Sequence, residues 1–205
     1  SDSSGWAAIL GGPALCPAGV PSPPMPKLLD AIDAASVRIG QLAAWLGLGM
    51  VGAAVTVTLG AKVGALFGAP LRFVALDELQ WYLFSATFLF AAPWALKEGA
   101  HVRVDVVQSR LGPRGRAWID LVGGVVLLLP FALFAVYVTW PTAMESLRLR
   151  ESSPDAGGLA RWPLKLAVPF AFGLLFLQGL STTLRAGAVA LGRAAAELAT
   201  PGEAR

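Results

Sequence analysis

The sequence predicts an all-α integral membrane protein with four transmembrane helices, joined by short amphipathic connecting segments. The chain has 205 residues, of which 56% are hydrophobic and only 14% are charged. A soluble domain of average composition carries about 25% charged residues. The apolar residues also gather in four runs without any charged residue, each close to the roughly 20 residues that cross the hydrocarbon core of a bilayer: 39–61, 79–96, 121–144 and 166–184.

A soluble domain with four buried helices is the alternative that the composition leaves open. Helices of soluble proteins carry a polar face towards solvent, and these four runs lack one. Tryptophans near the ends of the runs, among them Trp94 and Trp140, fit the aromatic belts found at membrane–water interfaces. Both observations favour the membrane.

The chain divides into three parts. Residues 1–26 form an extension rich in Pro and Gly, a composition that does not support a stable helix. The membrane domain is expected over 27–193, starting with an amphipathic lead-in, and residues 194–205 form a C-terminal tail. The four helices are expected at about 39–66, 76–97, 116–140 and 162–191.

The distribution of positive charge predicts the orientation. When both termini are placed in the cytoplasm, most of the 16 Lys and Arg residues lie on the cytoplasmic side, as the positive-inside rule requires. The basic segment 97–116 is then an inner loop whose arginines face lipid phosphates. The pI near 9.4 is therefore explained by contacts of basic side chains with membrane lipid, and no nucleic-acid partner is expected.

Glycines in the first run predict close helix packing. The stretch "GLGMVG" fits the GxGxxG pattern of dinucleotide-binding loops, but no strand–turn–helix context surrounds it. In a membrane helix, glycines instead form a smooth face on which another helix packs. The residues expected in this role are Gly49, Gly52, Gly60 and Gly64.

Two acids, Asp77 and Glu78, begin the second span beside Trp81. Carboxylates are favourably placed near a helix N-terminus, so they serve as interfacial acids in one interpretation. In the other interpretation they anchor a partner protein or a neighbouring basic residue such as Lys62. The sequence leaves both interpretations open.

The sequence contains no signature of a membrane enzyme. HExxH, GxSxG and paired mid-membrane aspartates are absent, and the single histidine, His101, cannot ligate a haem in the usual paired fashion. No charge lies at mid-depth in any of the four runs, which argues against an ion or substrate pathway within this chain. We therefore expect a scaffold with no catalytic residue, no cofactor and no metal.

Three stretches then resemble a known family: "ALDELQWYLFSATFLFAAPWALKEGAHVRVDVVQSRLGPRGRAWIDLVG", "ESSPDAGGLARWPLK" and "VPFAFGLLFLQGLSTTLR". Over 25–193 the chain resembles the small membrane subunit (Q subunit, or DctQ-like small permease) of tripartite ATP-independent periplasmic (TRAP) transporters. The second stretch is similar to a branch labelled mannitol/chloroaromatic-compound transport. Ala156 stands where that branch usually has proline, and Pro93 is a further departure.

The resemblance implies a non-catalytic accessory subunit of a sodium-coupled organic-acid uptake transporter in the bacterial inner membrane. A large membrane subunit would carry the moving elevator and the substrate site, and a periplasmic solute-binding receptor would deliver the substrate. The alternative is a structural subunit of a respiratory or photosynthetic complex, recruited from the same family and attached through residues 1–26. The candidate partner contacts are Asp77, Glu78, Trp81, His101, Arg103, Asp105, Asp155, Gly157, Gly158, Arg161, Trp162 and Lys165.

Overall fold

The computed structural model describes residues 27–68, 74–98 and 113–191. These residues are almost entirely helical, and the one extended feature among them is an isolated antiparallel bridge between Ser152 and Ala160. The elements are α2 (Lys27–Leu66), α3 (Val74–Lys97), α5 (Pro113–Gly123), the π-helical turn η1 (Gly124–Leu128), α6 (Leu129–Arg148) and α7 (Trp162–Ala190). The predicted all-α fold is confirmed for this part of the chain.

Helix α2 is longer than the expected span. It runs for 40 residues without a proline, so it measures about 60 Å at 1.5 Å per residue. The lead-in that we expected to precede the span is the first three turns of the same helix. Its acids are therefore held at a fixed angle to the rest of α2.

Helices α5, η1 and α6 form one continuous rod, where we expected a helix at about 116–140. Pro130 has no N–H, and its ring excludes the carbonyl one turn earlier. The chain adapts by widening to a π-helical turn immediately before it, where the Leu129 N–H bonds the Gly124 carbonyl. The expected end at 140 was too early, because Pro141 lies inside α6.

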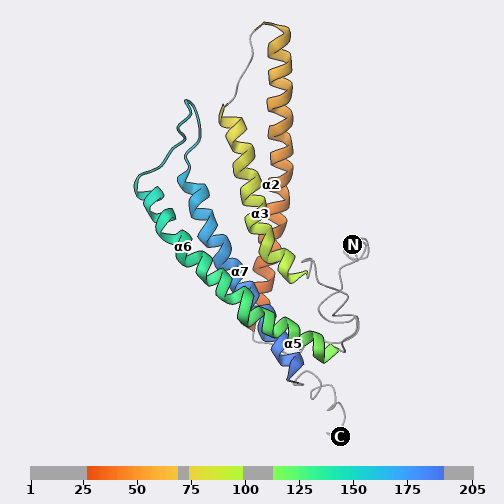
Figure 1. Ribbon diagram of the computed structural model, residues 1–205. Helices are drawn as coiled ribbons and strands as arrows, with labels where there is room; N and C mark the ends of the chain where they lie inside the picture. The colour runs from red at the N-terminus through yellow and green to blue at the C-terminus, as the bar shows by residue number, and fades with distance from the viewer. Residues whose placement is uncertain (1–26, 69–73, 99–112, 192–205) are drawn as a thin grey trace.

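The helices form two antiparallel pairs, α2 with α3 and α6 with α7 (Figure 1). The pairs approach each other near the start of α2 and the end of α7 and diverge towards their other ends (Figure 1). Helix α7 contacts every other described helix. The start of α2 and the end of α7 therefore lie on the same side of the molecule.

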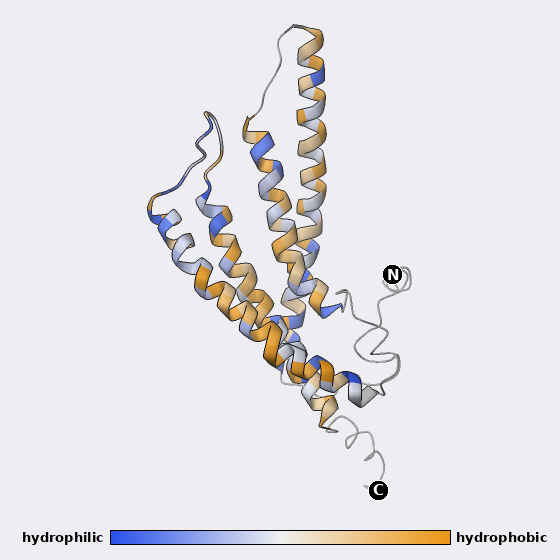
Figure 2. Cartoon of the chain, viewed as in Figure 1, coloured by the Kyte–Doolittle hydropathy of each residue, from blue (hydrophilic) through white to orange (hydrophobic). Residues whose placement is uncertain are grey.

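Three helical stretches are long and apolar enough to cross a membrane: Lys27–Leu66, Gly115–Arg148 and Trp162–Ala190. Figure 2 shows their apolar residues along the helices and hydrophilic residues near the ends. Helix α3 has the length, with 24 residues, but Gln80, Trp81, Tyr82 and Pro93 lower its mean hydropathy. The fourth span remains a prediction.

Candidate functional site, polar clusters at both ends of the helices

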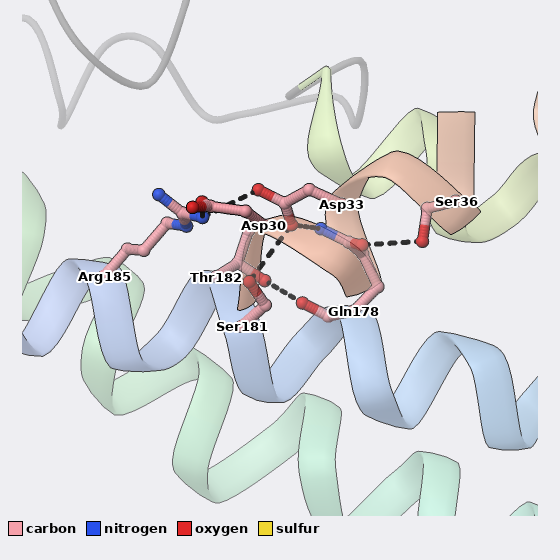
Figure 3. Close-up of polar contacts among 7 residues, drawn as sticks. All are labelled: Asp30, Asp33, Ser36, Gln178, Ser181, Thr182 and Arg185. Carbon is pink, nitrogen blue, oxygen red and sulfur yellow. Dashed lines mark hydrogen bonds and ion pairs between the residues drawn. The ribbon is translucent and has the colours of Figure 1, made fainter. Parts of the chain in front are cut away.

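A polar cluster joins α2 to α7 where the two helix pairs meet (Figure 3). We name it the inner network. Residues at one-turn spacing on each helix bring their side chains to the shared face. The members are Asp30, Asp33 and Ser36 on α2, and Gln178, Ser181 and Arg185 on α7. The Thr182 hydroxyl beside them donates to the Gln178 and Gly179 carbonyls of its own helix.

Gln178 is the centre of the inner network. Its side-chain carbonyl accepts a hydrogen bond from Ser36 Oγ at 2.6 Å, and its amide donates to Asp33 Oδ1 at 3.0 Å. Ser181 Oγ donates to the same Asp33 oxygen at 3.1 Å. Gln178 and Ser181 are fully buried and Ser36 is 2% exposed. Buried polar groups are tolerated only when paired, so these bonds specify how α2 sits on α7.

Arg185 forms ion pairs with both acids of the inner network. Its Nη2 lies 3.0 Å from Asp30 Oδ1 and 2.9 Å from Asp33 Oδ2. Asp33 thus accepts bonds at both oxygens, and its charge is opposed by the guanidinium. A carboxylate held in this way is occupied in binding α7, so the network is a helix-to-helix lock.

At the other end of the helices, a hairpin joins α6 to α7. We name residues 149–161 the outer hairpin. Two residues of α3 hold it: Glu78 accepts a hydrogen bond from the Leu159 N–H at 2.5 Å and another from the Ser153 hydroxyl, and Tyr82 donates to the Ala160 carbonyl at 3.0 Å. The hairpin therefore connects the two helix pairs a second time.

Glu151 fixes the base of the outer hairpin. Its carboxylate accepts hydrogen bonds from Lys165 Nζ at 2.5 Å and from Ser146 Oγ at 2.8 Å. Its backbone carbonyl accepts the Arg161 N–H at 2.8 Å. The Lys165 ammonium is the main cause that lowers the pKa of Glu151, followed by the Ser146 hydroxyl. The carboxylate is therefore ionised at neutral pH.

Glycine is required at two positions of the outer hairpin. Gly157 has a φ of 83°, in the left-handed region that favours glycine. A Cβ on Gly158 would lie 2.5 Å from Ser153 Cβ and 2.7 Å from Glu78 Oε2. The hairpin can approach α3 this closely because residue 158 has no side chain.

The candidate partner contacts differ in where they lie in the structure. Glu78, Gly158 and Lys165 hold the chain itself together, as described above. Asp77, Trp81, Asp155 and Arg161 are exposed, and Trp162 is half-buried at the start of α7. His101, Arg103 and Asp105 lie outside the described residues. None of these positions is tested against a partner, so their role as contacts stays a prediction.

The glycines predicted to pack against other helices differ in burial and in the space around them. Gly64 is buried, while Gly49 is exposed and a Cβ there would lie 3.6 Å from Leu83. Gly52 is exposed with no atom within 4 Å of an added Cβ. A closer approach on the same helix is at Gly40, where a Cβ would lie 2.5 Å from Trp94 Cβ. Sequence reasoning did not single out Gly40.

Sequence reasoning also missed the inner network, although a signal was present. Gln178 interrupts the fourth apolar run, and Ser181 and Arg185 follow it at one-turn spacing. Asp30 and Asp33 show the same spacing on α2. These two polar stripes could have been predicted from the sequence to pack against each other. Among the described residues, no group of three His, Cys, Asp or Glu side chains is placed to hold a metal ion.

Comparison with known proteins gives one match. The family model described as "Tripartite ATP-independent periplasmic transporters, DctQ component" matches residues 50–188. That range covers α3, the rod from α5 to α6, the outer hairpin and nearly all of α7, and it begins in the middle of α2. No curated protein and no solved structure matches the chain.

Proposed function

The chain belongs to the DctQ component family of tripartite ATP-independent periplasmic transporters, and on that premise we propose that it is the fixed, non-catalytic brace of such a transporter. The family supplies the small membrane subunit of the transporter. The proposed brace binds one side of the large membrane subunit and stays in place while that subunit moves substrate across the membrane. The substrate and ion sites then belong to the large subunit.

The observation that carries this proposal is that the buried polar side chains bond to other parts of the same chain. In the described part of the chain, four of the five buried polar side chains belong to these clusters: Ser36, Gln178 and Ser181 to the inner network, and Ser146 to the base of the outer hairpin. The inner network joins α2 to α7, and the base of the outer hairpin joins α6 to α7. The helices meanwhile expose large apolar side chains along their length, for example Val55 at 50% and Phe134 at 64%. A chain that is internally locked and apolar outside is suited to packing against lipid and another membrane subunit.

The finer features of the proposal follow from the sequence. The helices cross the inner membrane four times, with α3 as the least apolar span, and both termini lie in the cytoplasm. The outer hairpin then faces the periplasm, where its exposed side chains Asp155 and Arg161 meet the solute-binding receptor. Uptake is sodium-coupled and the substrate is an organic acid, in the branch labelled mannitol/chloroaromatic transport. The support for these features is the motif resemblance and the charge distribution.

Purification of the tagged full-length chain in mild detergent, followed by mass spectrometry of the proteins that remain bound, tests the proposal. We expect a large membrane subunit of a TRAP transporter at a fixed ratio to this chain. Recovery of a respiratory or photosynthetic complex instead, with cross-links to residues 1–26, would contradict the proposal and support the alternative assembly.

A further inference from the structure

Two polar side chains of α2, Arg38 and Gln41, lie on the exposed surface of the molecule. They share a face of α2 with exposed Ala34, with Leu42 at 64% exposure and with Trp45 at 71% exposure. Ser36 and Gly40 turn the opposite way, towards α7 and α3. Within the described residues, neither Arg38 nor Gln41 has a hydrogen bond or ion pair.

Helix α7 shows how deep this face lies. Ser36 meets Gln178 at 2.6 Å, so these two residues lie at the same level. Gln178 precedes Arg185, the first charge after the fourth apolar run, by about 10 Å of helix at 1.5 Å per residue. Arg38 and Gln41 follow Ser36 in the direction away from Arg185. Measured along the two helix axes, which diverge (Figure 1), they therefore lie at most roughly 13 and 18 Å from the level of Arg185, less than the roughly 30 Å thickness of a hydrocarbon core.

The rod from α5 to α6 gives the same depth. Leu121 begins the third apolar run, and its Cδ1 would lie 3.4 Å from a Cβ on Gly187, close to Arg185 on α7. The ring centroids of Trp140 and Phe170 lie 6.3 Å apart, near the opposite ends of the same two runs. The third run thus begins beside the end of the fourth run and ends beside its start. The two runs define one apolar layer, and Arg38 and Gln41 lie at the level of this layer.

Lipid is a poor neighbour for this pair. An arginine can carry its guanidinium some way towards the interface along its apolar stem, but the shorter Gln41 lies one turn farther from the inner surface. Unpaired amide and guanidinium groups in hydrocarbon are strongly unfavourable. Polar side chains on transmembrane helices are instead found hydrogen-bonded to neighbouring helices.

We infer that Arg38 and Gln41 form a docking stripe for a transmembrane helix of the large subunit, with an acidic side chain of that helix opposite Arg38. A guanidinium stays protonated and presents paired N–H donors that match a carboxylate. Gln41 donates to and accepts from polar groups of the same helix, and Ala34 allows the two helices to approach closely. This inference rests on the proposed function and identifies the surface through which the brace is attached.

Charge reversal in the assembled complex tests the inference. The full-length chain, co-expressed with the large subunit, is purified as wild type, Arg38→Glu, Arg38→Lys and Gln41→Leu. Lys62→Glu is the matched control, because Lys62 is an exposed cation near the far end of the same helix. We expect Arg38→Glu to lower the recovered large subunit roughly tenfold or more, because it places two carboxylates together in a low-dielectric layer. Arg38→Lys and Gln41→Leu should lower it less, and Lys62→Glu should leave it unchanged.

Each other outcome overturns the inference. Equal recovery with Arg38→Glu would exclude the ion pair, and equal loss with Lys62→Glu would show a general effect of charge on α2. Loss of bound anionic lipid from Arg38→Glu in native mass spectrometry, with the large subunit retained, would assign the stripe to lipid. Because Arg38→Glu could disturb folding, a photo-crosslinking amino acid in place of Gln41 gives a second measurement, and it should cross-link to the large subunit. Failure of the wild-type chain to recover any large subunit would instead contradict the proposed function.

Discussion

The contact between Gly40 and Trp94 gives a sharp test of the packing of α2 on α3. An added Cβ at residue 40 would lie 2.5 Å from Trp94 Cβ and 2.6 Å from Trp94 Cγ. These atoms are next to the α3 backbone, so the clash cannot be relieved by moving the far end of a flexible side chain. Gly40→Ala therefore requires α3 to move away from α2.

The two opposing effects of Gly40→Ala can be compared. Overpacking a well-packed site costs about 1–3 kcal/mol, and the upper end applies because both nearby atoms are close to the backbone. Replacing glycine by alanine inside a helix returns about 0.8–1.0 kcal/mol. The net loss is about 1–2 kcal/mol, which lowers the Tm of a chain of this size by roughly 2–8 °C.

Gly52→Ala is the matched control, since it makes the same chemical change in the same helix. No atom lies within 4 Å of the added Cβ, so only the gain in helix propensity remains, and the Tm should rise by a few degrees. Thermal unfolding of the purified full-length chain in mild detergent, followed by circular dichroism, measures both. If Gly40→Ala were as stable as Gly52→Ala, the close approach of α2 to α3 would be refuted.

Three further predictions concern the polar clusters. Asp33→Asn removes the charge that opposes Arg185 and should lower the free energy of unfolding by about 1–3 kcal/mol, measured by thermal unfolding; an unchanged Tm would contradict the lock between α2 and α7. The folded state lowers the pKa of Glu151, so its ionised form stabilises the protein above its usual pKa of 4.5 and that stabilisation is lost as the pH falls through the lowered value. The Tm difference between wild type and Glu151→Gln should therefore be present at pH 7 and shrink below pH 4.5, and a difference independent of pH would refute the pairing with Lys165. Gly158→Ala should push the outer hairpin away from α3 and speed its cleavage by protease, whereas unchanged cleavage would show that the hairpin tolerates a side chain there.

The sequence predicted the helices well because apolar runs without charge have few alternatives in a chain of this composition. Their ends were harder to predict. The start of α2 was placed too late because Asp30 and Asp33 lie in the lead-in, and charged residues were taken to mark the end of a membrane span. The end of the third helix was placed at about 140, whereas α6 continues through Pro141 to Arg148. The added turns carry contacts with other parts of the chain: Asp30 and Asp33 pair with Arg185, and Ser146 donates to Glu151.

The polar clusters could be predicted only in part. Glu78 and Gly158 were singled out, yet their contact depends on how the outer hairpin folds back on α3, which no local pattern specifies. Gln178 lay in a run that was judged by the absence of charge, so an uncharged polar residue drew no attention. Gly40 was passed over because glycine spacing indicates a smooth face without showing where a tryptophan from another helix will meet it.

The two polar clusters and the exposed stripe follow from the same physical constraint. In a bilayer the hydrophobic effect does not drive one apolar helix onto another, since lipid chains are equally apolar. Helix pairs that diverge, as α2–α3 and α6–α7 do, need directional bonds to set their relative position, and the inner network and Glu78 supply these bonds at opposite ends. The same reasoning applies to Arg38 and Gln41, which carry comparable bonding capacity on a face that the described residues leave uncovered. If polar groups in this layer exist to fix helices against each other, a stripe without a partner among the described residues marks the position of a helix from another subunit.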